Sequence, residues 1–418
     1  MGFTTRSLAA AAAAEGFMVL SIDAFADHDC ALVASNSVQV TEPWGTPKAA
    51  DQITAALRDH GFPPILLAGG TENWPELLHH LSTHGKLLGP TDAQCRQLRD
   101  VQLWRSAATA AGIAFPEVIE VADLARFEST VASSEKLAAS LEVQFLRKRY
   151  ASAGGLQMER LRNIQSTTEL SRQVNARQYL QRFVSGQTLG AQCVITNDGT
   201  QILGITGDIR LANRPRFLAA HEFIYAGSWG PIPARPPANL VPDGLQQSHG
   251  TLDVREAAKR LGDFLFHQTG YVGWIGFDFI QDPLGELWLL EANPRWTASM
   301  ELLLSQRPVA QHLSAYGFSW EGASDPARDD VAQAKAILYA WSNLQLTAER
   351  LQKLHELFEQ DGLGDVPALH QLDQVIEAGH PLLTLRATCP QSHHDDLTKQ
   401  CLLDILEPLQ QRVIEIFR

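Results

Sequence analysis

The chain has 418 residues, more than one hydrophobic core usually holds, so two to four domains or subdomains are expected. Its net charge of −13 argues against a nucleic-acid or membrane-surface partner, although a local cluster of Lys, Arg and metal could still bind an anionic substrate. Five cysteines without metal-ligand spacing or a paired framework indicate a reduced, cytoplasmic protein, and no apolar run approaches the roughly 20 residues of a membrane span.

The first 90 residues alternate between helix and strand patterns. Ser7–Glu15 are strong helix formers that Gly16 would stop, and the apolar run FMVLSID follows. Further strands are predicted at 31–40 and 64–68, and further helices at 48–60 and 74–84. We therefore predict a Rossmann-like α/β domain over residues 1–90. Because almost nothing precedes its first helix, we expect the first strand of this domain to be missing.

Two features of this region could bind a ligand, but each has a simpler interpretation. Gly69-Gly70 before a helix could cradle a phosphate, yet a tight strand-to-helix turn explains the pair as well. His80 and His84 have the i, i+4 spacing of metal ligands, but no third ligand is evident and a solvated helix face is favoured.

The stretch VQFLRKRYASAGGLQM combines a basic residue with a glycine-rich loop. A strand at 143–146 would deliver Lys148, followed by Arg149 and by the loop Ser152-Ala153-Gly154-Gly155. Glycine lets backbone amides approach an anion closely, and a nearby ammonium neutralises phosphate charge. Taken alone, the segment would be interpreted as an exposed loop. Its position upstream of the acidic hairpin described below favours a phosphate site.

A predicted strand at 179–184 and a hairpin turning at Asn197-Asp198-Gly199 come next. After them, basic side chains gather in a loop that precedes EFIYAGSWGPIP. Arginine pairs with carboxylates through two parallel hydrogen bonds, so this loop is a candidate substrate site, with a solvated loop as the alternative. The candidate substrate residues are Arg210, Arg214, His221 and Tyr225, with Arg216 in the same cluster.

The segment Tyr271–Glu301 carries the strongest chemical signal. Two apolar runs flank the turn Asp282-Pro283-Leu284-Gly285, so a β-hairpin is predicted, and Asp278 and Glu291 lie inside its strands. Burying a carboxylate in an apolar strand is costly unless it is paired or binds a cation. If Asp278 faces Leu289, Glu291 is its diagonal neighbour, roughly 5–8 Å away.

Oxygen ligands without Cys or His favour Mg²⁺ or Mn²⁺ over zinc. The predicted metal ligands are Asp278, Glu291 and Asn293.

GFDFI followed by LLEANPR resembles the metal-binding end of the ATP-grasp superfamily. The resemblance is best over residues 87–304, and it is nearest to carboxylate–amine ligases related to biotin carboxylase. It implies a mixed α/β (α+β) ATP-grasp fold with four parts. These are a pre-ATP-grasp domain (1–90), an entry helix and lid (91–182), a core antiparallel sheet with the metal site (183–320), and a small C-terminal extension (321–418).

The resemblance also implies roles for individual residues. Lys148, Arg149, Ser152, Gly154 and Gly155 match the family's phosphate-binding lysine and loop. At two further nucleotide positions this chain departs from the family: Gln181 stands where many relatives carry glutamate, and Arg99 is the nearest match to a first phosphate lysine. With Lys148, Arg295 would stabilise the transferring phosphoryl group or an oxyanion.

The implied reaction is ATP-dependent ligation. A substrate carboxylate attacks the γ-phosphate to give an acylphosphate, and an amine then displaces phosphate, with Mg²⁺ or Mn²⁺ as cofactor. Small-molecule carboxylates and amines would be the partners, in cofactor biosynthesis by analogy, and the protein could act as a homodimer. A carboxylase-like or kinase-like enzyme and a non-catalytic ATP sensor stay open as alternatives.

The C-terminal hundred residues are expected to play a structural role. Strands are predicted at 334–341 and 381–389, and helices at 347–360 and 397–417. His393-His394-Asp395-Asp396 could bind a metal, but a surface loop is the favoured interpretation.

Overall fold

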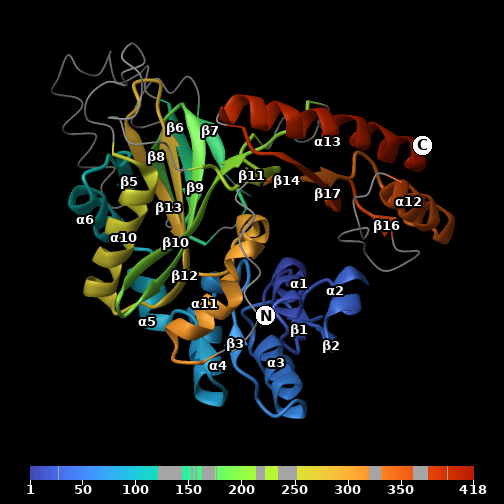
Figure 1. Ribbon diagram of the computed structural model, residues 1–418. Helices are drawn as coiled ribbons and strands as arrows, with labels where there is room; N and C mark the ends of the chain where they lie inside the picture. The colour runs from blue at the N-terminus through green and yellow to red at the C-terminus, as the bar shows by residue number, and fades with distance from the viewer. Residues whose placement is uncertain are drawn as a thin grey trace.

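The protein consists of an N-terminal α/β unit, a four-stranded sheet and a large antiparallel sheet (Figure 1). The computed structural model describes residues 1–26, 28–120, 144–151, 154–155, 158–161, 175, 177–212, 222–233, 252–319, 331–360, 375–392 and 394–418. Within these ranges, no helix is both long and apolar enough to cross a membrane.

The N-terminal unit contains two pairs of parallel strands and the helices around them. The strands are β1 (Leu20–Asp23), β2 (Asn36–Gln39), β3 (Ile65–Leu66) and β4 (Leu87–Leu88). The helices are α1 (Arg6–Ala14), α2 (His28–Val33), α3 (Pro47–Asp59), the short 3₁₀ turn η1 (Thr71–Asn73) and α4 (Pro75–His84). The predicted strand at 31–40 is thus part helix and part strand.

The residues before α1 form hydrogen bonds with both pairs of strands. Residues 1–3 run between β1 and β3 and bond to both sides: Met1 O accepts a hydrogen bond from Ala68 N at 2.7 Å, and Gly2 N donates to Ile22 O at 3.2 Å. Three residues are enough to join the two strand pairs, because in an extended chain successive backbone groups point alternately to the two neighbours.

The four-stranded antiparallel sheet has the order β5-β8-β6-β7 and follows two helices. Its strands are β5 (Val118–Glu120), β6 (Phe145–Arg149), β7 (Glu159–Leu161) and β8 (Gln178–Arg182). Where one entry helix was expected, the chain forms two, α5 (Asp92–Gln97) and α6 (Val101–Ala111). Asp100 separates the two helices and caps α6, since its side chain accepts a hydrogen bond from Gln102 N.

The large sheet has seven strands in the order β13-β12-β9-β10-β11-β14-β17. Its strands are β9 (Gln187–Thr196), β10 (Gly199–Asp208), β11 (Gly227–Gly230), β12 (Gly273–Gln281), β13 (Leu287–Asn293), β14 (Val331–Tyr339) and β17 (Pro381–Pro390). The two strands of the C-terminal region, β14 and β17, thus belong to the same sheet as the hairpin of β12 and β13.

Alternation along the strands gives this sheet one apolar and one partly polar face. In β14, Ala332, Ala334 and Ala336 belong to the large hydrophobic core, whereas Lys335 between them points to the other side. Pairing continues this polar row across the sheet, because Lys335 is opposite Ser228 in β11 and Arg386 in β17. The polar face therefore follows from the two-residue alternation of side chains along the strands.

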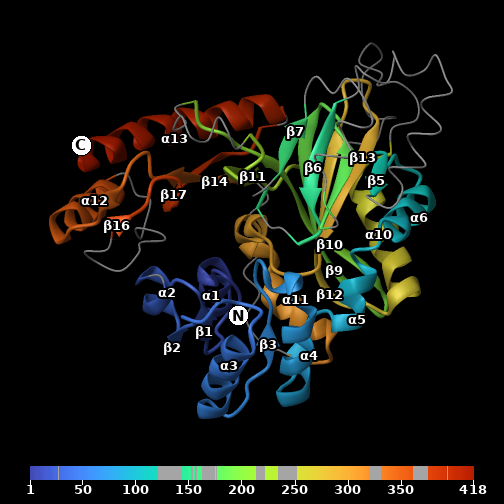
Figure 2. The same cartoon turned by 180° about the vertical axis from the view of Figure 1, so that it is seen from behind.

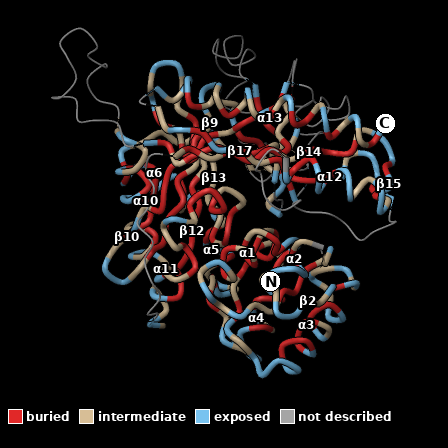
Figure 3. Tube along the Cα trace, turned by 45° about the vertical axis from the view of Figure 1, so that its right-hand side comes forward, coloured by how far each residue is buried: buried red, intermediate tan, exposed pale blue. Residues whose placement is uncertain are grey.

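Helices cover the apolar face (Figures 1 and 2). At one end these are α6 and α10 (Val254–Thr269), and at the other α12 (Ala348–Gln360) and α13 (Asp395–Phe417), near the small pair β15 (Leu344–Gln345) and β16 (Val375–Ile376). The N-terminal unit, α11 (Pro308–Ala315) and the 3₁₀ turns η5 (Ala298–Leu302) and η6 (Leu304–Gln306) lie on the other side. Buried residues follow the strands of this sheet in Figure 3.

Candidate active site

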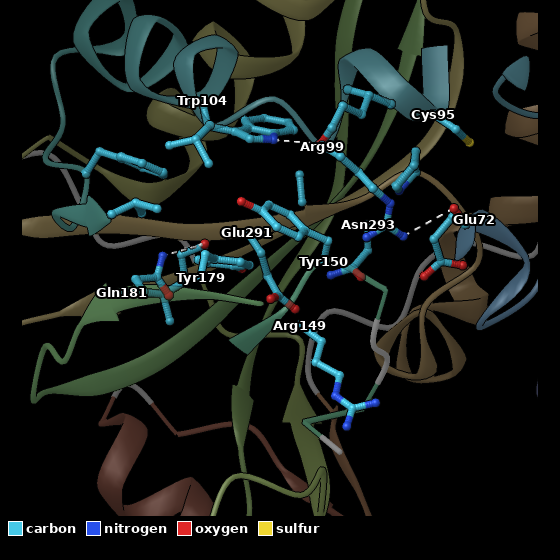
Figure 4. Close-up of a pocket in the computed structure, with 17 residues that line it drawn as sticks. Glu72, Cys95, Arg99, Trp104, Arg149, Tyr150, Tyr179, Gln181, Glu291 and Asn293 are labelled. Atoms are coloured by element: carbon cyan, nitrogen blue, oxygen red, sulfur yellow. Dashed lines mark hydrogen bonds between the residues drawn. The ribbon is translucent and has the colours of Figure 1, made fainter. Parts of the chain in front are cut away.

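A pocket lies between the four-stranded sheet, the edge strand β13, helices α5 and α6, and the N-terminal unit (Figure 4). It has an apolar part, made by Leu98, Trp104, Phe115 and Val118, and a polar part. The polar and ionisable side chains that line it are Glu72, Cys95, Arg99, Arg149, Tyr150, Tyr179, Gln181, Glu291 and Asn293. Apolar walls with a few convergent polar groups are typical of small-molecule sites.

At one side of the pocket, β6 and β8 bring Lys148 and Gln181 together. Lys148 is only 3% exposed, and its Nζ donates to Gln181 Oε1 at 3.3 Å and to Glu291 Oε2 at 2.9 Å. Gln181 Nε2 donates to the backbone oxygen of Leu290 at 3.3 Å. Three segments that are far apart in the sequence thus meet at a single buried ammonium group.

The predicted hairpin forms, but its register differs from the prediction. Asp278 pairs directly with Glu291 rather than with Leu289, which pairs with Phe279. A β-bulge between Asp278 and Phe279 inserts one residue in β13, and such an insertion shifts every pair beyond it. The two carboxylates are therefore direct cross-strand neighbours, closer than the diagonal arrangement that was expected.

This pairing perturbs both carboxyl groups. Burial, and then the neighbouring Glu291 carboxylate, raise the pKa of Asp278 above its usual range. Glu291 behaves oppositely, because the Lys148 ammonium lowers its pKa. Burial acts to lower the pKa of Lys148, but attraction to Glu291 and Tyr179 outweighs it, so that pKa lies above its usual value. The site accordingly places the Lys148 ammonium beside two carboxyl groups that are direct cross-strand neighbours.

A chain of hydrogen bonds connects this pair to the N-terminal unit. Asn293 Nδ2 donates to Asp278 Oδ2 at 3.0 Å, and Asn293 Oδ1 accepts from Arg295 Nη2 at 3.0 Å. Arg295 Nε in turn donates to Glu72 Oε1 at 2.8 Å, and both of these side chains are about nine-tenths buried. Arg295 therefore orients Asn293 and is itself held by Glu72.

These residues fit a hard divalent cation. Asp278 and Glu291 are adjacent oxygen donors, and burial together with the neighbouring Glu291 raises the pKa of Asp278, an effect that a bound cation would oppose. Among the residues that the structure describes, no cluster of three or more His, Cys, Asp and Glu side chains is found. Two carboxylates and an amide suit Mg²⁺, which commonly takes one or two protein carboxylates and completes its shell with substrate phosphates and water.

The other predicted nucleotide residues are placed as follows. Arg149 lines the pocket, while Gly154 and Gly155 adopt φ angles of 64° and 71° beside the segment 223–225. Gly154 O accepts a hydrogen bond from Tyr225 N at 2.9 Å. Ser152 lies outside the described residues.

Arg99 does not lie with Lys148. Its Nη2 atom donates to the backbone oxygen of Glu72 at 3.2 Å and to Asn73 Oδ1, next to the N-terminal unit. Arg99 still lines the pocket, but from the side where Glu72 lies.

The predicted substrate loop is only partly described. Arg214 and His221 lie outside the described residues, as does Arg216. Arg210 pairs with Asp208 at 3.2 Å and donates to the backbone oxygen of Glu222, and it does not line the pocket. Tyr225 lies on the polar face of the large sheet, where its hydroxyl bonds to Ser228 Oγ at 2.8 Å.

A second buried polar cluster, which the sequence analysis missed, lies on the same face. Glu301 Oε2 accepts from Lys335 Nζ at 2.7 Å and from Arg6 Nη2 at 2.9 Å, and Glu301 Oε1 accepts from Arg6 Nη1 and from Arg386 Nη2. Burial acts to raise the pKa of Glu301, but the three cations outweigh it and hold that pKa far below its usual range. Burial lowers the pKa of Lys335 to about 8.

A signal for this cluster was present in the sequence. Lys335 in AQAKAIL and Arg386 in LLTLRATC are charges inside apolar strands, the same anomaly that revealed Asp278. Arg6 and Glu72 carried no such signal, because each lies next to a helix or turn where a charged residue is ordinary.

The remaining candidates do not form metal sites in the described residues. His80 Nε2 bonds to Thr54 Oγ1 at 2.9 Å, and the ring of His80 stacks on that of His84. Gly70 has a φ of 92° and leads into η1, which is a tight turn that places Glu72. Asp395 and Asp396 begin α13, with His394 as the preceding residue, and His393 is not described.

Comparison with known proteins shows resemblance in structure only. No protein-family model and no curated protein matches this sequence. Among solved structures, the biotin carboxylase domain of the Hydrogenobacter thermophilus 2-oxoglutarate carboxylase, a dimer in complex with MgADP, ADP and bicarbonate, is 14% identical with a TM-score of 0.59, over 92% of this chain and 83% of that one.

Two more solved structures show the same similarity. N5-carboxyaminoimidazole synthetase from Staphylococcus aureus, complexed with ADP, is 13% identical with a TM-score of 0.60, over 98% of this chain and 95% of that one. The Campylobacter jejuni biotin carboxylase–β,γ-ATP complex is 14% identical with a TM-score of 0.58, over 91% and 85%. The predicted fold class is thus confirmed: over nearly its whole length, this chain has the ATP-grasp fold of biotin carboxylase and N5-carboxyaminoimidazole synthetase.

Proposed function

We propose that this protein is an ATP-dependent ligase that activates a substrate carboxylate as an acylphosphate and joins it to an amine, with release of ADP and phosphate. The observation that carries the proposal is the direct pairing of Asp278 with Glu291 beside the buried Lys148, at the wall of a pocket with an apolar part. Two carboxyl groups that need a cation, next to an ammonium that can meet a phosphate, suit a magnesium nucleotide.

The pocket suggests how the nucleotide lies. The base would fit between the apolar side chains, including Trp104 and Phe115, with Gln181 and the exposed edge of β13 as hydrogen-bonding groups. Lys148 would then donate to phosphate oxygens, exchanging its contact with Glu291 for one with the ligand. Arg149 would contribute charge at the rim. Asp278 and Glu291, with Asn293, would hold Mg²⁺, which would neutralise phosphate charge when bound.

The chain's own residues have three tasks in the reaction. Lys148 stabilises the negative charge that develops on the phosphoryl group. Arg295, fixed by Glu72 and Asn293, keeps the hairpin end in place and stabilises the oxyanion of the attacked carbonyl. The walls of the pocket exclude water, which would otherwise hydrolyse an acylphosphate. No covalent nucleophile is required, because the substrate carboxylate itself attacks the γ-phosphate. Cys95, which lines the pocket, is an unsuitable nucleophile, since burial raises its pKa to about 12.

A carboxylase-type reaction is a second candidate, because the fold relatives include biotin carboxylase and a complex with bicarbonate. It would use the same nucleotide residues, with bicarbonate as the carboxylate that attacks the γ-phosphate. A homodimer, by analogy with the dimeric carboxylase domain, would be tested by light scattering.

The test measures ADP and phosphate release from Mg·ATP with pools of carboxylic acids, pools of amines, both together, and bicarbonate. Ligase activity requires release that depends on both a carboxylate and an amine, together with an amide product seen by mass spectrometry. Release that depends on bicarbonate instead would favour the carboxylase. Tight Mg·ATP binding without release under any condition would contradict both and favour a nucleotide sensor.

A further inference from the structure

The end of the pocket beside the N-terminal unit contains an anion and a cation that the proposed nucleotide site does not use. Glu72 is 6% exposed, and its Oε1 atom is held by Arg295. Its Oε2 atom is buried but makes no hydrogen bond with any residue that the structure describes. A buried carboxylate oxygen normally has a partner, so an open one on the wall of a pocket is a place where a ligand donor belongs.

The complementary cation is Arg99. Only its Nη2 atom is engaged, by the backbone oxygen of Glu72 at 3.2 Å and by Asn73 Oδ1. Within the described part of the chain, Nη1 and Nε have no partner and remain donors on the pocket wall. Because both hydrogens of Nη2 are used, neither parallel pair of donors is complete, and Arg99 can give a carboxylate one charge-assisted hydrogen bond, from Nη1 or from Nε.

The two charges are held at short range by rigid supports. Gly70, with a φ of 92°, turns the chain so that η1 presents Glu72 to the pocket, and Arg295 fixes the carboxylate from behind. Arg99 follows directly after α5 and bonds to the backbone of Glu72 itself. The distance between acceptor and donor is therefore set before any ligand binds.

In Figure 4 this end of the pocket lies on the opposite side of Glu291 from Gln181. If the nucleotide base lies by Gln181 and its phosphates by Glu291, the ligand at Glu72 and Arg99 faces the phosphate end. Asn293 and Arg295 connect the two regions through hydrogen bonds. This is the side from which an acceptor would approach an activated carboxylate.

We propose that Glu72 and Arg99 form the acceptor subsite and select an α-amino acid as the amine substrate. Glu72 Oε2 accepts from the α-ammonium group, and Arg99 binds the α-carboxylate. An α-amino acid carries both charges on one carbon, and few other small metabolites match a fixed anion–cation pair so closely. The inference rests on the proposed function and deepens it, since it names the class of amine.

The test uses calorimetric titration in the presence of Mg²⁺ and a non-hydrolysable ATP analogue whose own binding is measured first. The twenty common amino acids are then titrated one by one, and each ligand found is compared with its decarboxylated amine and its deaminated acid. The wild type should bind each of these two analogues with an affinity at least about tenfold lower than that for the amino acid, because each analogue lacks one charge-assisted contact.

Two variants separate the contacts. Arg99→Gln should bind the amino acid and its decarboxylated amine with nearly equal affinity, and Glu72→Gln should do the same for the amino acid and its deaminated acid. Glutamine can still accept from Arg295, so the fold and the nucleotide affinity should persist in Glu72→Gln. Arg105→Gln is the matched control: Arg105 is an exposed residue of α6 that bonds to Gln102, and its loss should change nothing.

The outcomes are distinct for the two proposals. Nucleotide binding without binding of any amino acid overturns the acceptor subsite and leaves the ATP site standing. The subsite is also overturned if Arg99→Gln and Glu72→Gln both still bind the amino acid more tightly than its two analogues, since the amino acid then binds elsewhere. Absence of nucleotide binding overturns the ligase proposal. If the amino acid still binds with the expected pattern in the two variants, the subsite is supported without it. If neither the nucleotide nor any amino acid binds, both proposals are overturned.

Discussion

Lys148 shows how one residue connects the strands at one side of the pocket. An ammonium that is only 3% exposed needs partners, and here a carboxylate and an amide oxygen supply them. The cost of burying the charge is thus offset by these two contacts, so the proposed ATP site would have its lysine in place before a ligand binds. The same contact links β6 to β13 across the pocket.

Glu291→Gln is expected to abolish magnesium-dependent turnover while the protein stays folded. The change removes the charge of one proposed metal ligand and half of the Lys148 pair, so ATP turnover should fall by at least about a hundredfold. Steady-state ADP release at several Mg²⁺ concentrations measures the loss. Glu286→Gln, an exposed change on the same hairpin, should leave turnover unaltered. Unchanged activity in Glu291→Gln would rule out the metal assignment.

At the scale of elements, the hairpin of β12 and β13 shows what sequence patterns can and cannot predict. Its strands, its turn and the three polar side chains near its end were all predictable from apolar runs and turn residues. Its register was not, because the bulge after Asp278 leaves no mark in a two-residue pattern. The direct contact between the two carboxylates is therefore a structural finding.

The glycine loop offers a prediction at this scale. A Cβ on Gly155 would lie 1.8 Å from the backbone oxygen of Phe223, whereas a Cβ on Gly154 would meet nothing within 4 Å. Both residues have positive φ, so alanine costs about 1–2 kcal/mol of strain at either one. Gly155→Ala must in addition displace the segment at Phe223 and should weaken Mg·ATP binding more than Gly154→Ala. Equal dissociation constants for the two variants would contradict the packing.

At the scale of the whole molecule, the cluster around Glu301 joins three parts of the chain. Arg6 belongs to α1, Glu301 to η5 and Lys335 to β14, so one carboxylate connects the N-terminal unit with the C-terminal strands. Contacts between residues 295 positions apart cannot be read from local patterns. For this reason the sequence predicted the parts of the fold but not the residues that join them.

Glu301→Gln should destabilise the protein by about 3–5 kcal/mol, because it leaves buried cations without their counter-charge. Denaturant-induced unfolding at pH 7 measures this change. Glu349→Gln is the control, since it breaks an exposed i, i+4 pair with Lys353, and such solvent-exposed pairs contribute little to stability. A loss below 1 kcal/mol in Glu301→Gln would show that the cluster contributes little.

The same cluster predicts the direction of the pH dependence. The folded state keeps Glu301 ionised because its pKa is far below the usual value, while the unfolded chain takes up a proton near pH 4.3. The stability from Glu301 is therefore full above about pH 4.3 and is lost as the pH falls below it. The difference in unfolding free energy between wild type and Glu301→Gln should shrink from pH 7 to pH 3. A constant difference would contradict the assignment.

The edge strand β13 has a consequence for how the protein behaves at high concentration. Ala114 bonds to its outer side, accepting from Leu289 N at 3.0 Å and donating to Leu287 O at 2.9 Å, and beyond this bridge the strand borders the pocket. An open strand edge is a template on which another chain can add a strand and start aggregation. The segment after α6 covers this edge at Leu287 to Leu289, and residues 290–293 of β13 line the pocket. A nucleotide bound in the pocket would thus also hinder another chain from pairing with β13.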